Sequence, residues 1–263
     1  MGELHEKTEN TGITSRRVGL LVTCLIDMFR PNAGFAAVKL LEEAGYEVEV
    51  PEQGCCGQPN FNGGDSAGAR VMALQMIETF ADFDYVVVPS CSCAAMLSVH
   101  YPELFEADSA PAQAAEELAS RTWELTSFLH DVVGLTELSA EFNGRVVVQD
   151  SCSGLRELGV QQQPRALLNK LTGLTELPLR NPEVCCGFGG TFCVKYPDIS
   201  NRIADKKLAD IHALEEPVDA LVSTDLGCLL HLSGKLHREG SPIRALHVAE
   251  LLAGMAGEAE DTD

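Results

Sequence analysis

The stretches YVVVPSCSC (residues 85–93) and RVVVQDSC (residues 145–152) each place three consecutive valines shortly before a cysteine. Continuous runs of β-branched residues are typical of parallel strands that are buried on both faces. In open parallel sheets, functional residues gather just beyond the carboxyl ends of the strands. The two stretches therefore predict an α/β fold in which cysteines lie at the carboxyl ends of parallel strands.

Cysteines recur in the same order in the two halves of the chain. The first set is Cys24, Cys55, Cys56 and Cys93, and the second is Cys152, Cys185, Cys186 and Cys228. Corresponding cysteines lie 128, 130 and 135 residues apart, a near-constant offset that indicates an internal duplication. We therefore expect two pseudo-symmetric lobes, each a small parallel sheet flanked by helices. The first lobe covers residues 1–140 and includes a helical connector, and the second covers residues 141–263 and ends in an acidic tail.

Helices and strands alternate within each half. Apolar residues three and four positions apart predict helices over residues 33–44, 66–81, 164–171 and 199–213. Alternating apolar and acidic residues predict a strand with one solvated face over residues 46–51, at a sheet edge. The connector contains EELASRTWELTSFLHDVV, which predicts one amphipathic helix with Trp123 and Leu129 in the core.

The composition limits the classes of function. The net charge of −20 opposes nucleic-acid binding, because a phosphate backbone would be repelled, and it fits docking on cationic patches of partner proteins. The first 15 residues are polar, and no stretch approaches the roughly 18–20 apolar residues of a membrane-spanning helix. We therefore expect a cytoplasmic protein without a membrane span. Thiols stay reduced in that compartment, so ten cysteines favour metal ligands or redox groups over disulfides.

Three explanations compete for the paired cysteines. A structural zinc site usually takes two close cysteine pairs, and neither half of this chain contains two such pairs. Buried structural cysteines would have no reason to recur in register in both halves. An iron–sulfur cluster accepts thiolates from separate loops, and the glycines beside the cysteine pairs let the backbone approach a bulky inorganic group. The pattern favours iron–sulfur binding and leaves the other two explanations open.

At this point the motifs resemble a known family. The repeated pattern of one cysteine, a CCG pair and a further cysteine is similar to the CCG cysteine-rich domain found in heterodisulfide reductase and in the iron–sulfur subunit of glycolate oxidase. The stretches GCCGQPNFNGGD, VVVPSCSCAAM, DSCSGLRELG, CCGFGGTFCVKYPDIS and STDLGCLLHL look more like the lactate-utilisation protein A family. The resemblance spans about residues 17–253. It implies a cytosolic component of a system that oxidises L-lactate to pyruvate, with a ferredoxin-like iron–sulfur protein and a third small subunit as partners.

The resemblance also implies a ligand set, which consists of Cys24, Cys55, Cys56, Cys93, Cys152, Cys185, Cys186 and Cys228. We expect one [4Fe–4S] cluster per lobe, because the five-thiol set of the reductase domain is not reproduced. Ser90 and Asp225 stand where that set has a further cysteine. Cys91, Cys193 and Asp225 are left open as additional ligands. Asp150 and Asp225 lie at strand ends, where a carboxylate can accept hydrogen bonds from a helix N-terminus.

Three functions follow as hypotheses. The first is an electron-transfer subunit of a lactate-oxidising complex, with a small 2-hydroxy acid as a possible substrate of this chain. The second is a heterodisulfide-reductase-like subunit for thiol and disulfide redox chemistry. The third is a metal-bound scaffold without a redox role. No glycine-rich nucleotide motif follows a predicted strand, so the sequence does not support nucleotide binding.

Overall fold

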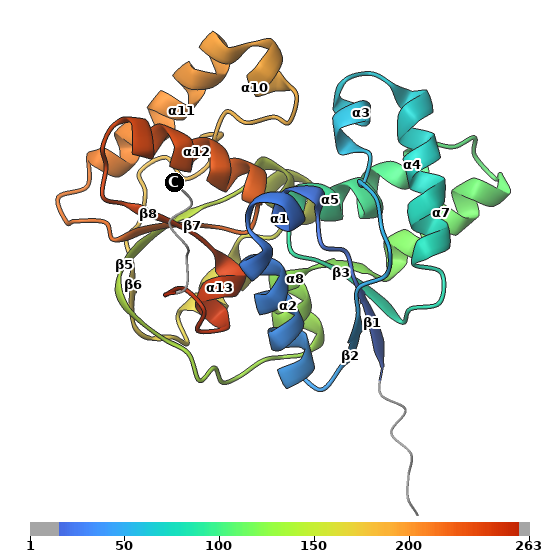
Figure 1. The fold of residues 1–263 in the computed structure, drawn as a ribbon, viewed down its shortest axis with the longest axis horizontal. Helices are drawn as coiled ribbons and strands as arrows, with labels where there is room; N and C mark the ends of the chain where they lie inside the picture. Colours follow the sequence, from blue (N-terminus) through green and yellow to red (C-terminus); the bar gives the residue numbers. More distant parts are fainter. Residues whose placement is uncertain (1–15, 258–263) are drawn as a thin grey trace, which may run out of the picture.

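The computed structural model describes residues 16–257 and contains two four-stranded parallel sheets (Figure 1). The acidic tail predicted at the end of the second lobe lies largely outside these residues. The first sheet has the order β2-β1-β3-β4 and the second has the order β6-β5-β7-β8. The strands are β1 (Arg17–Leu20), β2 (Glu47–Glu49), β3 (Tyr85–Val88), β4 (Thr122–Glu124), β5 (Glu141–Gln149), β6 (Thr172–Glu176), β7 (Ala220–Ser223) and β8 (Arg244–His247).

The two sheets have the same topology, because each strand of the first has a counterpart at the same place in the second. This repetition confirms the predicted α/β fold with two pseudo-symmetric lobes. The valine runs form β3 and the buried end of β5, and the predicted edge strand is β2. The boundary predicted at residues 140 and 141 falls directly before β5 and stays a prediction.

Helices flank both sheets. In the first lobe they are α1 (Cys24–Phe29), α2 (Pro31–Glu43), α3 (Gln58–Asn62), α4 (Ser66–Thr79), α5 (Cys91–Ala95), η1 (Met96–His100), α6 (Tyr101–Glu103), α7 (Ala110–Ser120), α8 (Leu125–Ser127) and η2 (Phe128–Val132). In the second lobe they are η3 (Gly154–Leu158), α9 (Gln162–Leu168), α10 (Phe192–Lys195), α11 (Pro197–His212), α12 (Leu226–Arg238) and α13 (Val248–Leu252). The four predicted helices correspond to α2, α4, α9 and α11.

The connector is not the single amphipathic helix that its sequence predicts, and that prediction was wrong. The chain forms α7, then the short strand β4, then α8 and η2. β4 pairs in parallel with β3, with Thr122 opposite Val86 and Glu124 opposite Val88, and thereby completes the first sheet. Three residues are too few to show a strand period in the sequence, and the pairing partner lies more than thirty residues earlier. Leu129 is fully buried as predicted, and Trp123 is half-buried against the core.

The side chains of each sheet divide between a central and an outer layer. Val87 of β3 packs in a central cluster with residues of α2, η2, α9 and α13, whereas Val86 and Val88 pack in an outer cluster against α4 and α7. Val147 of β5 faces the other outer layer, which α11 and α12 cover. The central cluster contains residues from both sheets, so the two lobes share one hydrophobic core.

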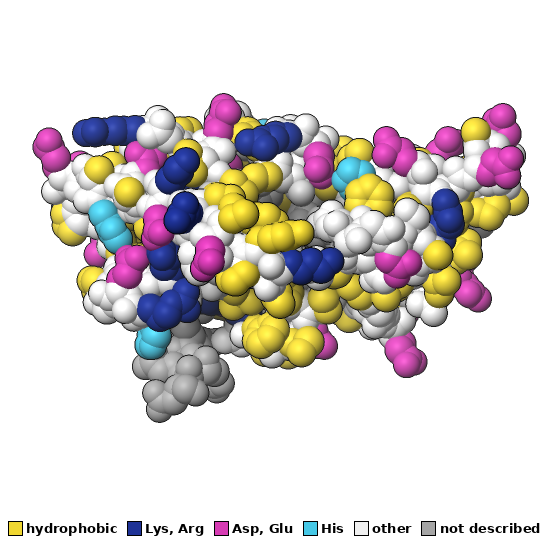
Figure 2. Space-filling view, turned by 90° about the horizontal axis from the view of Figure 1, so that it is seen from above, with side chains coloured by type: hydrophobic (Ala, Val, Ile, Leu, Met, Phe, Trp, Pro, Cys, Tyr) yellow, Lys and Arg dark blue, Asp and Glu magenta, His cyan; other side chains and the backbone are white. Residues whose placement is uncertain are grey.

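Polar contacts also join the lobes. Arg30 at the end of α1 forms an ion pair with Glu250 of α13, with 2.8 Å between Nε and Oε1, and Glu250 is almost fully buried. Lys39 of α2 donates to the carbonyl oxygen of Ala253 at 2.8 Å. From above, acidic side chains are spread over the visible face, whereas Lys and Arg gather on the second-lobe side (Figure 2).

Candidate metal centre

The four predicted cysteines of the first lobe meet at the carboxyl end of the first sheet. Cys24 begins α1 after β1, the 55–56 pair lies in the loop between β2 and α3, and Cys93 lies in α5 after β3. The thiol of Cys56 donates to the sulfur of Cys93 at 3.3 Å. Cys55 accepts hydrogen bonds from the thiols of Cys24 and Cys56. The structure thus brings these four side chains into one contact group.

The second lobe repeats this arrangement. Cys152 follows β5, the 185–186 pair lies in the loop before α10, and Cys228 lies in the first turn of α12. The sulfur atoms of Cys186 and Cys228 lie 2.9 Å apart, and Cys185 accepts hydrogen bonds from Cys152 and Cys186. All eight predicted residues are therefore gathered, four in each lobe. Their role as ligands stays a prediction.

In each group, the surroundings of one cysteine favour its thiolate, which is the form that binds metals. Hydrogen bonds from Cys24 and then Cys56 lower the pKa of Cys55 to about 2, and hydrogen bonds from Cys152 and then Cys186 lower the pKa of Cys185 to about 2. Backbone N–H groups add to this effect, because Gly57 donates to Cys55 at 3.5 Å and Gly187 donates to Cys185 at 3.3 Å. Backbone donors of this kind also stabilise the negative charge of a bound cluster.

Glycine is required directly after each cysteine pair. Gly57 and Gly187 have φ angles of 83° and 91°, a region that side-chain-bearing residues rarely adopt. A Cβ atom at Gly187 would lie 2.5 Å from the carbonyl oxygen of Ser200 in α11. The glycine therefore lets the loop turn tightly while it packs against the next helix.

Asp225 lies between the two groups, and its carboxylate accepts three hydrogen bonds. Its Oδ2 accepts from the hydroxyl of Ser90 at 3.0 Å and from the backbone N–H of Ser92 at 2.9 Å. Its Oδ1 accepts from the N–H of Cys228 at 3.3 Å. This confirms the prediction that it caps a helix N-terminus, and its oxygens are directed at N–H and O–H donors rather than at the thiol groups.

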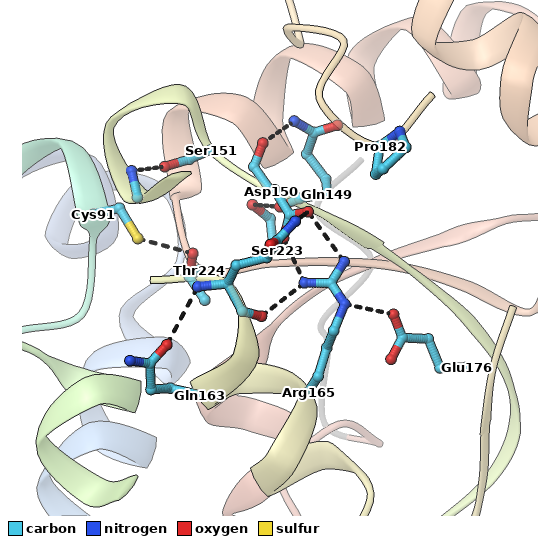
Figure 3. A network of polar contacts seen from close by, with 12 residues as sticks. Cys91, Gln149, Asp150, Ser151, Gln163, Arg165, Glu176, Pro182, Ser223 and Thr224 are labelled. Atoms are coloured by element: carbon cyan, nitrogen blue, oxygen red, sulfur yellow. Dashed lines mark hydrogen bonds and ion pairs between the residues drawn. The ribbon is translucent and has the colours of Figure 1, made fainter. Parts of the chain in front are cut away.

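Asp150 has different partners from those predicted. Its carboxylate pairs with the guanidinium of Arg165, with 2.7 Å between Nη1 and Oδ1, and Arg165 also binds Glu176 at 2.9 Å (Figure 3). The expected acceptance from a helix N-terminus is therefore wrong for Asp150. An arginine from α9 reaches the end of β5 and provides stronger, charged donors.

Cys91 and Cys193 occupy contrasting places. Cys91 is completely buried, and its sulfur lies 3.0 Å from the hydroxyl of Thr224 in the other lobe, toward which it points in Figure 3. It forms part of the contact between lobes and not of a four-thiol group. Cys193 is half-buried at the edge of the cavity beside the first-lobe thiols, although it belongs to the second lobe.

Both thiol groups face the seam between the lobes. A cavity of about 250 Å³ adjoins the first group and one of about 120 Å³ adjoins the second. Four residues line both cavities, namely Gln58, Ser92, Phe188 and Gly190. A groove of about 600 Å³ on the outer side also reaches Cys24 and Cys55.

Sequence reasoning missed several side chains that support the groups. Tyr101 is fully buried, and its hydroxyl donates to the carbonyl oxygen of Cys56 at 2.8 Å. Gln58 donates to the carbonyl oxygen of Ser92 at 3.1 Å. Ser200 links Gly187 to His231, with the His231 Nε2 atom 3.1 Å from the serine hydroxyl. These contacts cross between elements, so no local spacing in the sequence indicates them.

The described part of the chain contains neither a ready site for a single metal ion nor a helix that could span a membrane. Within residues 16–257, no three His, Cys, Asp and Glu side chains are arranged to hold a single metal ion. In each four-thiol group, one pair of sulfur atoms instead lies in direct contact, Cys56 with Cys93 at 3.3 Å and Cys186 with Cys228 at 2.9 Å. Over the same residues, no helix combines the length and the hydrophobicity that a membrane span requires.

Comparison with known proteins identifies the repeated unit. The CCG cysteine-rich domain matches residues 18–98 and again residues 146–233, one copy in each lobe. Lactate utilization protein A of Geobacillus kaustophilus (strain HTA426) is 46% identical over 90% of this chain and 98% of its own length. The proteins of that name from Geobacillus thermodenitrificans (strain NG80-2) and Bacillus cereus (strain G9842) are 46% and 43% identical over the same shares. Among solved structures, glutamate racemase isoform RacE1 from Bacillus anthracis has a TM-score of 0.36 at 13% identity over 93% of this chain and 81% of its own, a likeness too weak to bear on function.

Proposed function

This chain belongs to the lactate utilization protein A family, and we propose that it is the iron–sulfur electron-transfer subunit of an L-lactate-oxidising complex. Its role in lactate utilization follows from the family. The finer proposal is that each lobe holds one [4Fe–4S] cluster and that the chain passes electrons from the 2-hydroxy acid to a ferredoxin-like partner. A third small subunit completes the complex. The complex, with this chain, lies in the cytoplasm, where thiols stay reduced.

The observation that carries the proposal is the convergence of eight thiols into two groups of four. Four cysteine thiolates are the usual ligand set of a four-iron cluster. In each lobe, the four thiols come from three separate segments that meet at the carboxyl end of one sheet. Zinc sites in proteins more often take two close pairs from short loops, a spacing that this chain lacks.

Each group of four thiols would hold one cluster. Cys24, Cys55, Cys56 and Cys93 would hold the first cluster, and Cys152, Cys185, Cys186 and Cys228 the second. A bound cluster would supply one-electron redox chemistry. The N–H groups of Gly57 and Gly187 would offset its negative charge, and the shared seam would bring the two centres to the same side of the molecule.

Anaerobic purification followed by iron and sulfide analysis tests this proposal. We expect about eight iron and eight sulfide per chain, since each cluster contains about four of each. Cys56→Ser and Cys186→Ser should each lose about half of both, because each removes a ligand of one cluster only. Cys91→Ser is the matched control and should retain the full content, because Cys91 lies outside both groups.

Two outcomes of the metal analysis would contradict the proposal. Zinc without sulfide would indicate the scaffold hypothesis, and an unchanged iron content in Cys56→Ser would show that the ligand assignment is wrong. Lactate-dependent bleaching of the loaded chain in the presence of its partner proteins would support electron transfer from the 2-hydroxy acid. Bleaching by a dithiol alone, without any response to lactate and partners, would indicate the thiol and disulfide chemistry of heterodisulfide reductase.

A further inference from the structure

One part of the surface combines exposed apolar and basic side chains beside the thiol groups. α10 and the start of α11 expose Val194, Tyr196 and Ile199, which are 79%, 56% and 54% accessible. Lys195, Arg202 and Lys206 are exposed on the same two helices. We call these six residues the α10–α11 patch.

The basic residues of this patch lack acidic partners. Ile199, Arg202 and Lys206 are three and four residues apart, so they share one face of α11. Within residues 16–257, Lys195, Arg202 and Lys206 form no ion pair, and the nearby Asp205 is bound instead to Lys235 at 2.6 Å. Two exposed carboxylates lie on this part of α11, Asp198 and Asp205, and Lys235 offsets the charge of Asp205. The patch is therefore locally positive on a chain whose net charge is −20.

The position of the patch connects it to both thiol groups. The segment that leads into α10 lines both cavities, because Phe188 and Gly190 contribute to each. Val194 itself lines the cavity of the first group. From above, dark blue side chains of the second lobe lie beside hydrophobic side chains near the middle of the molecule (Figure 2). A protein bound here would lie close to the seam that both groups face.

The fold does not require exposed, unpaired basic residues on the helix at this position. The equivalent helix of the first lobe, α4, exposes Val71 and Leu74 but has a single basic residue, Arg70, whose guanidinium donates to the carbonyl oxygen of Leu104. The same duplicated element therefore carries free positive charge in one lobe only.

We infer that the α10–α11 patch is the docking surface for an acidic electron-transfer protein. The inference rests on the proposed function and specifies where the redox partner binds. Positive charge attracts an acidic partner over a distance and orients it, while the apolar residues are dehydrated on contact. The partner's redox centre would then lie near the shared seam.

The test uses an acidic plant-type [2Fe–2S] ferredoxin as the probe and the full chain purified anaerobically. Its affinity is measured by isothermal titration calorimetry at low and at moderate salt. We expect binding at low salt that weakens as salt increases. Arg202→Glu combined with Lys206→Glu should weaken binding about tenfold or more and flatten the salt dependence. Ile199→Ser should weaken it less and leave the salt dependence unchanged.

The controls are Arg238→Glu, the same charge reversal as each single substitution but at the far end of α12, and Val71→Ser on α4, and the affinity of both variants should stay within about twofold of that of the original chain. The inference is overturned if the original chain does not bind the ferredoxin at low salt, or if the double variant binds equally well. It is also overturned if sedimentation shows that the double variant abolishes self-association instead. Iron and sulfide analysis of the same samples decides the proposed function separately, because calorimetry reports docking whether or not the chain holds clusters.

Discussion

A single carboxylate, that of Asp225, serves the N-termini of two helices from different lobes. It accepts from Cys228 N in its own helix α12 and from Ser92 N in α5. In the duplicated sequence its counterpart is Ser90, whose hydroxyl donates to it directly. Two equivalent positions in contact indicate that the pseudo-two-fold relation between the lobes passes here. The partial positive charge of both helix N-termini is therefore shared by one anion.

Glu124 and His247 are a second pair of counterparts, since each ends the fourth strand of its sheet. Glu124 Oε2 accepts from Thr126 N at 2.8 Å and from Ser127 N at 3.0 Å, whereas its Oε1 is buried without a partner in the described chain. Burial raises the pKa of Glu124 to about 7 and lowers the pKa of His247. Both groups are thus held closer to their neutral forms.

The raised pKa of Glu124 predicts a specific pH dependence of stability. In the unfolded chain the carboxyl ionises near 4.5, and in the folded chain near 7. The folded state binds this proton more tightly than the unfolded state. The contribution of Glu124 to the free energy of unfolding is therefore fully present below about pH 4.5 and is lost as the pH rises through about 7. The free energy of unfolding of the original chain should therefore fall between pH 5 and pH 8, and Glu124→Gln should make this fall smaller by about 2 kcal/mol. Urea unfolding of the metal-free chain and of the variant at both pH values measures the difference, and equal pH profiles would contradict the prediction.

At the scale of elements, local pattern predicted most of the fold. The valine runs predicted β3 and β5, because a strand buried on both faces is apolar throughout. The helices α2, α4, α9 and α11 have enough turns to show an amphipathic period. β4 and β8 have three and four residues, and their place in the sheets depends on pairing with β3 and β7. Such pairing is long-range information that a local period does not contain.

The candidate site, too, could be predicted as far as local sequence pattern shows it, and not where it depends on contacts between distant elements. Matched cysteines in two repeats, each after a strand, are sufficient to predict two groups at sheet edges. The contact of Cys91 with Thr224 and that of Asp225 with Ser90 could not be predicted, because the partners lie more than 130 residues apart in the chain. The pairing of Asp150 with Arg165 depends on how α9 packs beside the end of β5. The cavities at the seam likewise depend on how the lobes pack.

The loop that carries the second cysteine pair gives a prediction about element geometry. Gly187→Ala would place a Cβ atom 2.5 Å from Ser200 O at a φ of 91°, so the loop must move away from α11. We expect loss of about half of the iron and sulfide together with a lower midpoint of thermal unfolding. The control, Gly240→Ala, has a φ of 67° and no heavy atom within 4 Å of the added carbon. It should cost only about 1 kcal/mol of backbone strain and keep the full iron content. Full iron in Gly187→Ala would show that the loop tolerates the shift.

On the scale of the whole molecule, the duplicated lobes are not independent units. Their sheets enclose a common layer that includes α2, α9 and α13, and the central cluster draws residues such as Leu20 and Val87 from the first sheet and Val148 and Leu246 from the second. Separation of the lobes would expose this apolar layer to water, and the buried Glu250 would lose its partner Arg30. The shared layer also fixes the seam that both thiol groups face.

We therefore predict that the metal-free chain unfolds in one cooperative transition. Trp123, the only tryptophan, reports on the first sheet, and a Trp123→Phe, Phe142→Trp variant moves the fluorescent reporter to β5 of the second. Urea unfolding curves from the two reporters should coincide. Leu252→Ala, in the second-lobe helix α13, should lower the free energy of unfolding by about 2–5 kcal/mol at both reporters equally, because Leu252 is buried in the common cluster. A Leu252→Ala effect confined to the β5 reporter, or two separate transitions, would show that the lobes fold as independent domains despite the layer between them.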